Sequence, residues 1–269
     1  MHQHQVSHRL QGEVTVFLVG CGGTGSQILT GLGRLHTSLL ALGHRHGLKV
    51  IVYDEDNVSE ANVGRQLFYP QDVGQNKATV LVTRVNAAFG TRWQAMPCRF
   101  TEGTSTNHTY GAKIVIGCVD TRASRRAILG YCRRVRTDYW LDLGNRAGDG
   151  QVVLGEPLGN QQKDWHMRLP TVVELFPSVL EEDAPEDDLP SCSLAEALEK
   201  QELFINQGIA THGLQLLWTM FRRGALDHSV IFVNLNTGRV NPLPIDREVW
   251  KRFGHRTYRK PPQRKLNTA

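Results

Sequence analysis

Apolar residues in the first half of the chain follow two alternating patterns. Short apolar and β-branched runs, typical of buried strands, are separated by longer segments with apolar residues at helical spacing. The predicted strands are 13–19, 49–53, 93–100, 113–119 and 139–143, and the predicted helices are 26–42, 77–89 and 123–135. This alternation predicts an α/β fold, a Rossmann-like, doubly wound and mostly parallel sheet with its ligand site at the carboxyl ends of the strands.

The second half of the chain predicts an extension of that sheet. Its elements are an outer strand at 151–155, a long crossover loop at 156–193 rich in Pro and acids, a helix at 194–221 that could break near Gly208, and antiparallel strands at 230–235 and 240–243. We therefore expect one nucleotide-binding domain, 1–246, with a C-terminal extension of helix and antiparallel strands, and a basic tail, 247–269.

Composition restricts the class of protein. A hydrophobic content of 40% and a charged content of 21% are ordinary for a soluble globular chain. No run approaches the roughly 18 apolar residues that span a bilayer, and the first residues are polar rather than signal-like, so we expect a cytoplasmic protein that binds no membrane. The five cysteines are spread along the chain without a C-x-x-C pair, which argues against a disulfide framework and against zinc.

The net charge of +5 comes largely from the predicted tail, whereas 181–188 is an acidic run. Two interpretations of the tail stay open: a solvated or disordered extension, or a segment that docks on an acidic partner or on nucleic acid.

A glycine cluster lies between the first predicted strand and its helix. Gly20, Gly22 and Gly25 form a G-x-G-x-x-G motif, and Gly23 lies within it. Glycine allows the backbone to turn tightly and approach a phosphate chain, while the helix amino terminus offers free N–H groups and a partial positive charge. The motif predicts a nucleotide or dinucleotide site, and a structural turn without a ligand is the alternative.

An acidic residue, Asp54, ends the second predicted strand. An acid in this place can accept hydrogen bonds from the ribose hydroxyls of a nucleotide. Asp56 competes for the same role, and an acid that caps a turn is the alternative interpretation.

Two cations and two amides downstream of Asp54 distinguish between classes of nucleotide. They are Arg65, Lys77, Asn62 and Gln66. A nicotinamide cofactor has only a pyrophosphate to neutralise, whereas the leaving group of ATP needs additional positive charge in the transition state. These residues favour ATP.

The sequence resembles the superfamily of ThiF, MoeB and ubiquitin-activating enzymes. Four motifs of that superfamily occur here in the same order: G-x-G-G-x-G-S, D-x-D-x-V, N-x-x-R-Q and V-G-x-x-K. Here they occupy 20–26, 54–58, 62–66 and 73–77. The family's D-N-x-x-x-R motif becomes 120–125, with Thr121 in place of Asn. The resemblance covers 13–155 well and the remainder loosely. The segments 201–206 and 241–244 are similar to the ThiF-type protein of the PRTRC cassette.

The resemblance implies an ATP-dependent adenylyltransferase, whose substrate is the carboxyl terminus of a small ubiquitin-like or sulfur-carrier protein. That carboxylate would attack the α-phosphate of ATP, giving an acyl adenylate and pyrophosphate. The motif match assigns Asp54 to ribose, Asn62, Arg65, Gln66 and Lys77 to the phosphates, and Asp120 to Mg²⁺. Arg125 assists the phosphates or caps its helix, and both interpretations stay open.

Cys192 follows the crossover loop and precedes a helix. In the family, a cysteine near this place can take the acyl group as a thioester, so Cys192 is either such a nucleophile or an unreactive surface thiol. The family also implies a homodimer. In relatives an arm before the first strand lends an arginine to the neighbouring subunit, and Arg9 is the candidate here.

Two other classes of function stay open. An NAD- or FAD-dependent oxidoreductase would share the glycine turn and Asp54, but it would not explain Arg65 and Lys77 together with Asp120. A non-catalytic nucleotide-binding scaffold from a plasmid-type gene cassette would bind a partner through the basic tail.

Overall fold

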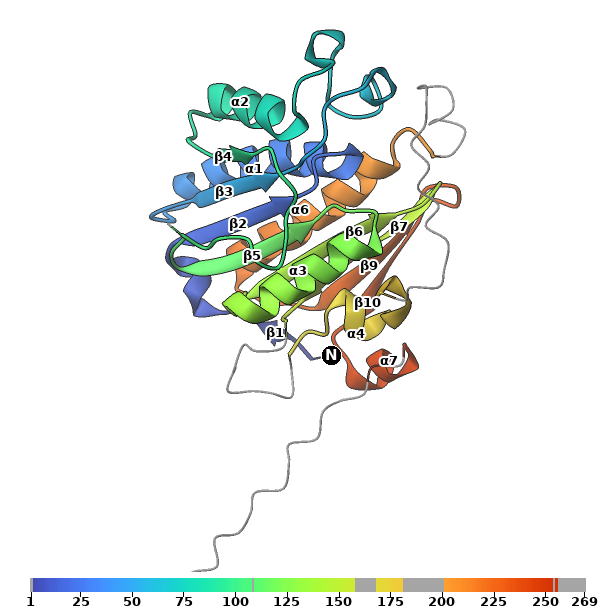
Figure 1. Ribbon diagram of the computed structural model, residues 1–269. Helices are drawn as coiled ribbons and strands as arrows, with labels where there is room; N and C mark the ends of the chain where they lie inside the picture. The colour runs from blue at the N-terminus through green and yellow to red at the C-terminus, as the bar shows by residue number, and fades with distance from the viewer. Residues whose placement is uncertain (1, 108, 158–167, 181–200, 254, 256–269) are drawn as a thin grey trace, which may run out of the picture.

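The computed structural model describes residues 2–107, 109–157, 168–180, 201–253 and 255. Its centre is an eight-stranded sheet (Figure 1). In spatial order the strands are β10 (Arg239–Pro244), β9 (His228–Asn234), β7 (Asp149–Gly155), β6 (Tyr139–Asn145), β5 (Ala112–Gly117), β2 (Val14–Val19), β3 (Leu48–Tyr53) and β4 (Gln94–Met96). The five strands from β6 to β4 run parallel, and β7, β9 and β10 continue the sheet in antiparallel pairs.

Helices cover both faces of the parallel part. On one face α1 (Gly23–Ala41) packs against α2 (Lys77–Phe89) and α6 (Ile205–Arg223), and α3 (Arg122–Val135) covers the other face (Figure 1). Every residue of β2 is buried, because this strand has a helix layer on each side and a parallel neighbour at each edge. This arrangement confirms the predicted mostly parallel, doubly wound sheet.

Two predicted strands differ from those observed. The strand expected at 93–100 is reduced to β4, which pairs with β3 over three residues before Pro97 removes a backbone donor. The prediction that 151–155 forms an outer strand is wrong, because β7 lies between β6 and β9. The apolar pattern predicts a strand at 151–155, but it contains no information about which strands lie beside it.

The crossover segment contains more structure than expected. Its described part includes the short helix α4 (Val172–Leu175), capped by Thr171 and Glu174, and the 3₁₀ helix η5 (Pro177–Leu180). Residues 181–200, which include Cys192 and the start of the predicted helix 194–221, lie outside the described residues. The described helix begins at Ile205 and continues through Gly208 without a break.

The first residues of the predicted basic tail are packed on the body of the protein. They form α7 (Arg247–Arg252), in which Trp250 is 1% exposed. The ring of Phe253 stacks on Phe232, with 6.2 Å between ring centroids. Burial of these rings attaches the segment to the end of the sheet at β9 and β10, so 247–253 does not extend into solvent. Residues 256–269 lie outside the described residues.

The remaining strands are short. At the amino terminus β1 (His4–Gln5) pairs with β8 (Ala225–Leu226) in a separate two-stranded sheet.

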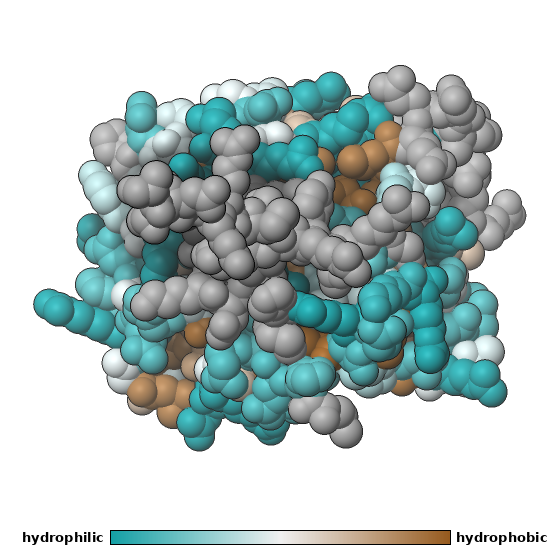
Figure 2. All heavy atoms as spheres, turned by 90° about the horizontal axis from the view of Figure 1, so that it is seen from below, coloured by the Kyte–Doolittle hydropathy of each residue, from teal (hydrophilic) through white to brown (hydrophobic). Residues whose placement is uncertain are grey.

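Among the described residues, no helix combines the length and apolar character needed to cross a bilayer. The described part of the face in Figure 2 is mostly hydrophilic, with small separate apolar areas.

Candidate functional site

The tips of three parallel strands meet at the carboxyl edge of the sheet. The Gly20 N–H donates to the Tyr53 carbonyl at 2.9 Å, and the Cys118 N–H donates to the Val19 carbonyl at 2.8 Å. The tip of β2 is therefore held between those of β3 and β5. The chain reverses its direction of winding between β2 and β5, and ligands of open α/β sheets bind at such a point.

The glycine turn can exist only without side chains at two of its positions. A Cβ on Gly20, whose φ is +90°, would lie 2.5 Å from the Cys118 carbonyl oxygen, and a Cβ on Gly25 would lie 1.9 Å from the Gly20 carbonyl oxygen. A Cβ on Gly22 would have no neighbouring heavy atom within 4 Å. The turn therefore closes tightly while its outer side stays open, next to the first N–H groups of α1, which have no intrahelical partners.

The turn is also covered by a residue that the motifs did not indicate. A Cβ on Gly23 would lie 2.4 Å from the side chain of Asn206, which is 5% exposed in the first turn of α6. The Asn206 amide oxygen accepts a hydrogen bond from the Thr24 hydroxyl at 3.0 Å, and its nitrogen donates to Gln201 Oε1 at 3.0 Å. The contact brings the amino termini of α1 and α6 to one place.

Arg65 joins the same group of side chains. Its Nη1 donates to Gln201 Oε1 at 2.8 Å, and its Nε is buried without a partner among the described residues. Burial lowers the pKa of Arg65. The Leu67 N–H donates to Ser26 Oγ at 3.3 Å, which holds this segment over the first turn of α1. Gln201 therefore links the Arg65 guanidinium to Asn206, in the first turn of α6.

Asp54 faces the glycine turn. Its carboxylate accepts hydrogen bonds from the Cys21 N–H at 2.5 Å and from the Asp56 N–H at 2.9 Å. Burial raises the pKa of Asp54, and these two donors and the nearby Lys77 oppose that rise. The carboxylate retains lone pairs that could accept the hydroxyls of a ribose.

Lys77 begins α2 beside the same strand tip. Its ammonium is 3.0 Å from Asp56 Oδ2, and its side chain is 11% exposed against 63% for that of Asp56. Asn76 caps the helix and donates to the carbonyls of Asp54 and Asp56 at 2.9 and 3.1 Å. The two acids therefore differ in their contacts: Asp54 faces the glycine turn, whereas Asp56 is paired with Lys77.

The two predicted amides differ in their surroundings. Asn62 is 9% exposed and its Oδ1 accepts the Ser59 N–H at 3.0 Å, which closes the short 3₁₀ helix η2 (Glu60–Asn62). Gln66 is 8% exposed, and its Oε1 is buried without a partner among the described residues. A buried amide without a partner is the kind of group that a ligand can satisfy.

Asp120 and Arg125 lie at the tip of β5 and in the first turn of α3. The Asp120 side chain is exposed, and its carbonyl accepts a hydrogen bond from Arg125 Nη1 at 3.1 Å. Thr121, in the place of the family's Asn, caps α3 by accepting the Ser124 N–H at 3.2 Å. Among the described residues, no three His, Cys, Asp or Glu side chains are grouped for a metal. In nucleotide sites Mg²⁺ takes one or two carboxylates together with phosphate oxygens, and the exposed Asp120 carboxylate is a ligand of that type.

Three of the four described cysteines are shielded from solvent. Burial raises the pKa of Cys21 and of Cys118 well above the ordinary value, and Cys132 is also buried. Cys98 is exposed on the surface. A buried thiol that keeps its proton is a weak nucleophile, which argues against Cys21 and Cys118, while Cys192 lies outside the described residues and stays a prediction from the resemblance.

Arg9 lies at the opposite edge of the sheet from the site. Its guanidinium donates to Asp138 Oδ1 at 2.6 Å and to the Gly111 carbonyl at 2.8 Å. Gly111 immediately precedes β5, and Asp138 immediately precedes β6. In this structure Arg9 therefore makes contacts within its own chain at the amino ends of β5 and β6.

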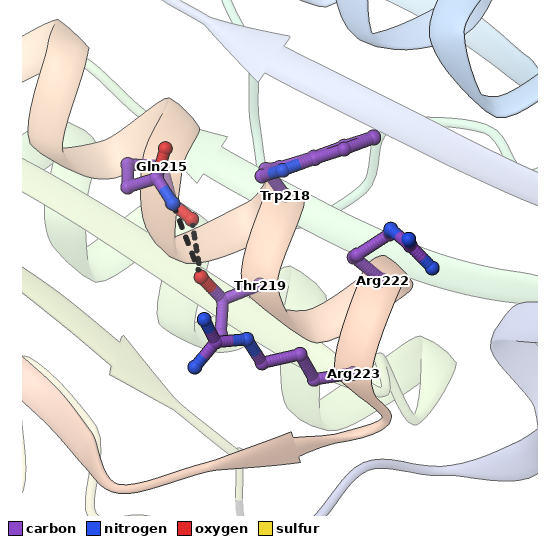
Figure 3. A pocket seen from close by; sticks show the side chains of 5 residues that line it. All are labelled: Gln215, Trp218, Thr219, Arg222 and Arg223. Atoms are coloured by element: carbon purple, nitrogen blue, oxygen red, sulfur yellow. Dashed lines mark hydrogen bonds between the residues drawn. The ribbon is translucent and has the colours of Figure 1, made fainter.

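A surface pocket of about 390 Å³ lies apart from these residues (Figure 3). It is lined by Gln215, Trp218, Thr219, Arg222 and Arg223, all from the second half of α6. Because Asn206 is in the first turn of the same helix, this pocket is not part of the strand-tip site.

Comparisons with known proteins agree with this architecture. The model of the ThiF family matches residues 7–249. A search of curated protein sequences gave no match. Among solved structures, PaaA has a TM-score of 0.56 at 14% identity, covering 88% of this chain and 74% of its own. E. coli MccB has a TM-score of 0.58 at 14% identity, covering 89% of this chain and 64% of its own. The structure of E. coli MccB with ATP has a TM-score of 0.55 at 15% identity, and the present chain spans 65% of its length.

Proposed function

The chain belongs to the ThiF family, and from that premise we propose that it uses ATP to activate a carboxylate as an acyl adenylate. The observation that supports the proposal is the set of contacts at one sheet edge: Asp54 with the glycine turn, Lys77 with Asp56, and Arg65 with Gln201. An oxidoreductase needs no such pair of cations beside its dinucleotide turn.

The chemistry follows from the charges at this edge. A carboxylate oxygen attacks the α-phosphorus of ATP, the bond to the bridging oxygen breaks, and pyrophosphate leaves with that electron pair. Charge therefore develops on the leaving phosphates, and the free N–H groups at the amino terminus of α1 would stabilise it if Asp54 held the ribose. To reach a phosphate, Lys77 would exchange its one ion-pair partner, the exposed Asp56 carboxylate 3.0 Å away, for a phosphate oxygen. Arg65 approaches from the side of α6.

The finer assignments belong to the same proposal. The substrate carboxylate is the C-terminus of a small ubiquitin-like or sulfur-carrier protein, and Asp120 binds the Mg²⁺ that accompanies ATP. E. coli MccB has been crystallised with ATP and with MccA, which supports the combination of a nucleotide with a peptide or protein partner. Transfer to Cys192, a homodimer, and membership of the PRTRC type extend the proposal and rest on the resemblance alone.

A lysine substitution tests the proposal. Lys77→Met keeps the length of the side chain and removes its charge. Loss of one preorganised charge at developing negative charge slows reactions by about 10²–10³-fold, so we expect that loss in ATP–pyrophosphate exchange measured with candidate carrier proteins. Lys251→Met, on the surface of α7 and 51% exposed at its side chain, is the matched control and should behave as the parent.

Three results decide between the alternatives. Exchange by Lys77→Met equal to that of the parent contradicts a phosphate role for Lys77. Tight NAD binding without any exchange favours an oxidoreductase. Binding of ATP by the parent without AMP formation in the presence of every carrier favours a scaffold.

A further inference from the structure

A buried carboxylate near the proposed site takes no part in the motifs. Asp142 lies on β6, opposite Gly117 of β5, and is 1% exposed under α3. Its Oδ2 is 3.2 Å from Arg125 Nε, in the first turn of α3, where the arginine side chain is 11% exposed. A buried ion pair needs good geometry to offset the loss of hydration, and it fixes its partners more firmly than a surface pair does.

This pair holds the Arg125 guanidinium toward the carboxyl end of β6. Nη1 donates to the Asp120 carbonyl at 3.1 Å, and Nη2 lies 3.3 Å from the place where a Cβ on Gly144 would be. Asp142 Oδ1 is buried without a hydrogen-bond partner among the described residues. The guanidinium is thus held through Nε and Nη1, while Nη2, beside Gly144, makes no hydrogen bond among the described residues.

The order of the strands gives this cation a place distinct from that of Lys77. Along the edge, Asp54 follows β3, the glycine turn follows β2, Asp120 follows β5, and Asp142 lies on β6. Neighbouring strands are about 4.8 Å apart, so the line from β3 to β6 covers roughly 14 Å. Lys77 is on the β3 side of that line, and β5 separates it from Arg125.

We propose that Arg125, positioned by Asp142, receives the carboxylate of the acyl substrate and directs it at the α-phosphate from the β6 side. The inference rests on the proposed function and names the part of the site that recognises the second substrate. A guanidinium matches a carboxylate in a planar pair of hydrogen bonds. With Nε held by Asp142, the second Nη1 proton and Nη2 form the end of the Arg125 guanidinium that can make such a pair, so Asp142 is a positioning residue.

The test separates recognition of the carboxylate from binding of the nucleotide. The full chain is loaded with the ATP analogue AMPCPP and Mg²⁺, and the binding of a peptide ending in Gly-Gly is measured by calorimetry. The same peptide with an amidated C-terminus is the reference. We expect the parent to bind the free acid at least tenfold more tightly than the amide.

The variants then locate the source of that preference. Arg125→Gln and Asp142→Asn should reduce the preference to less than twofold, Arg125→Lys should retain part of it, and AMPCPP affinity should stay within twofold of the parent's. Asp138→Asn is the matched control, because Asp138 is also 1% exposed and paired with an arginine, Arg9, at the opposite end of β6. It should keep the preference in full.

The outcomes divide cleanly. A preference that persists in Asp142→Asn, or its absence in a parent that binds AMPCPP, overturns the inference and leaves the proposed function standing. Weaker AMPCPP binding by Arg125→Gln with the acid preference intact assigns Arg125 to the phosphates and also overturns it. A parent that binds no AMPCPP contradicts the proposed function itself.

Discussion

Glu156 offers a quantitative test of the fold away from the site. The residue follows β7 with 0% exposure, its Oε2 accepts the Leu169 N–H at 2.9 Å, and its Oε1 is buried without a partner among the described residues. Burial raises the pKa of this carboxyl from 4.5 to about 7, although Leu169 and Arg168 oppose the rise. Glutamine has nearly the same shape and keeps an acceptor for Leu169, so Glu156→Gln removes the titration with little change in packing.

The direction in which the stability changes with pH follows from which state, folded or unfolded, binds the proton. Below the unfolded pKa of 4.5 both states carry the proton, and between there and about 7 only the folded state keeps it, so the stability of the parent falls as pH rises through this window and is level above it. Each pH unit between the two pKa values corresponds to about 1.4 kcal/mol. The loss is therefore about 3 kcal/mol, on an order-of-magnitude basis.

Urea unfolding at pH 5, 6, 7 and 8 measures this directly. The free energy of unfolding of Glu156→Gln relative to the parent should rise by about 3 kcal/mol between pH 5 and pH 8. Glu248→Gln, 74% exposed at its side chain, is the control and should show no such rise. A difference that does not change with pH would mean that Glu156 is already ionised in the folded protein, where His4 Nδ1 lies 3.8 Å from its Oε2, and the argument from burial would be refuted.

Two further predictions concern the glycine turn and the end of the chain. Gly25→Ala places a Cβ 1.9 Å from a backbone oxygen and should lower the free energy of unfolding by at least about 1–3 kcal/mol in urea. Gly22→Ala adds its methyl group to open space, so it should unfold as the parent does but bind AMPCPP more weakly if the turn holds phosphates. Trp250→Ala should lower the free energy of unfolding by about 3–5 kcal/mol, since its ring is 1% exposed, and a change below about 1 kcal/mol would mean that α7 does not pack on the body.

Local patterns predicted the elements of the parallel sheet well. The helix at 77–89 is observed with the expected bounds, because its apolar spacing, its Asn76 cap and the following Gly90 in a left-handed conformation all agree. The antiparallel half was predicted less well. β7 is apolar like a central strand and lies after a hairpin from β6, yet whether another strand covers its far side depends on β9, which is more than 70 residues away along the chain. Composition within a strand does not encode that distant partner.

The residues of the candidate site also divide into those that local sequence patterns predict and those that they do not. Gly20, Gly25, Asp54 and Lys77 can be found from the sequence because a turn, a strand end and a helix start are local features, and a nucleotide motif spans them. Asn206, Gln201 and Asp142 cannot be found in this way, because each acts through a partner far away in the chain, at Gly23, Arg65 and Arg125 respectively.

Those partners become neighbours only when the strands take their spatial order. Asp142 meets Arg125 because β6 lies beside β5 and α3 crosses over both, which brings the first turn of the helix above the end of the strand. A buried acid within an apolar strand is nevertheless a signal in its own right, since an ionised group is rarely buried without a partner of opposite charge. Asp142, between Leu141 and Leu143, has this pattern in the sequence. It indicates that a cation must approach from another element, and only the fold identifies that cation as Arg125.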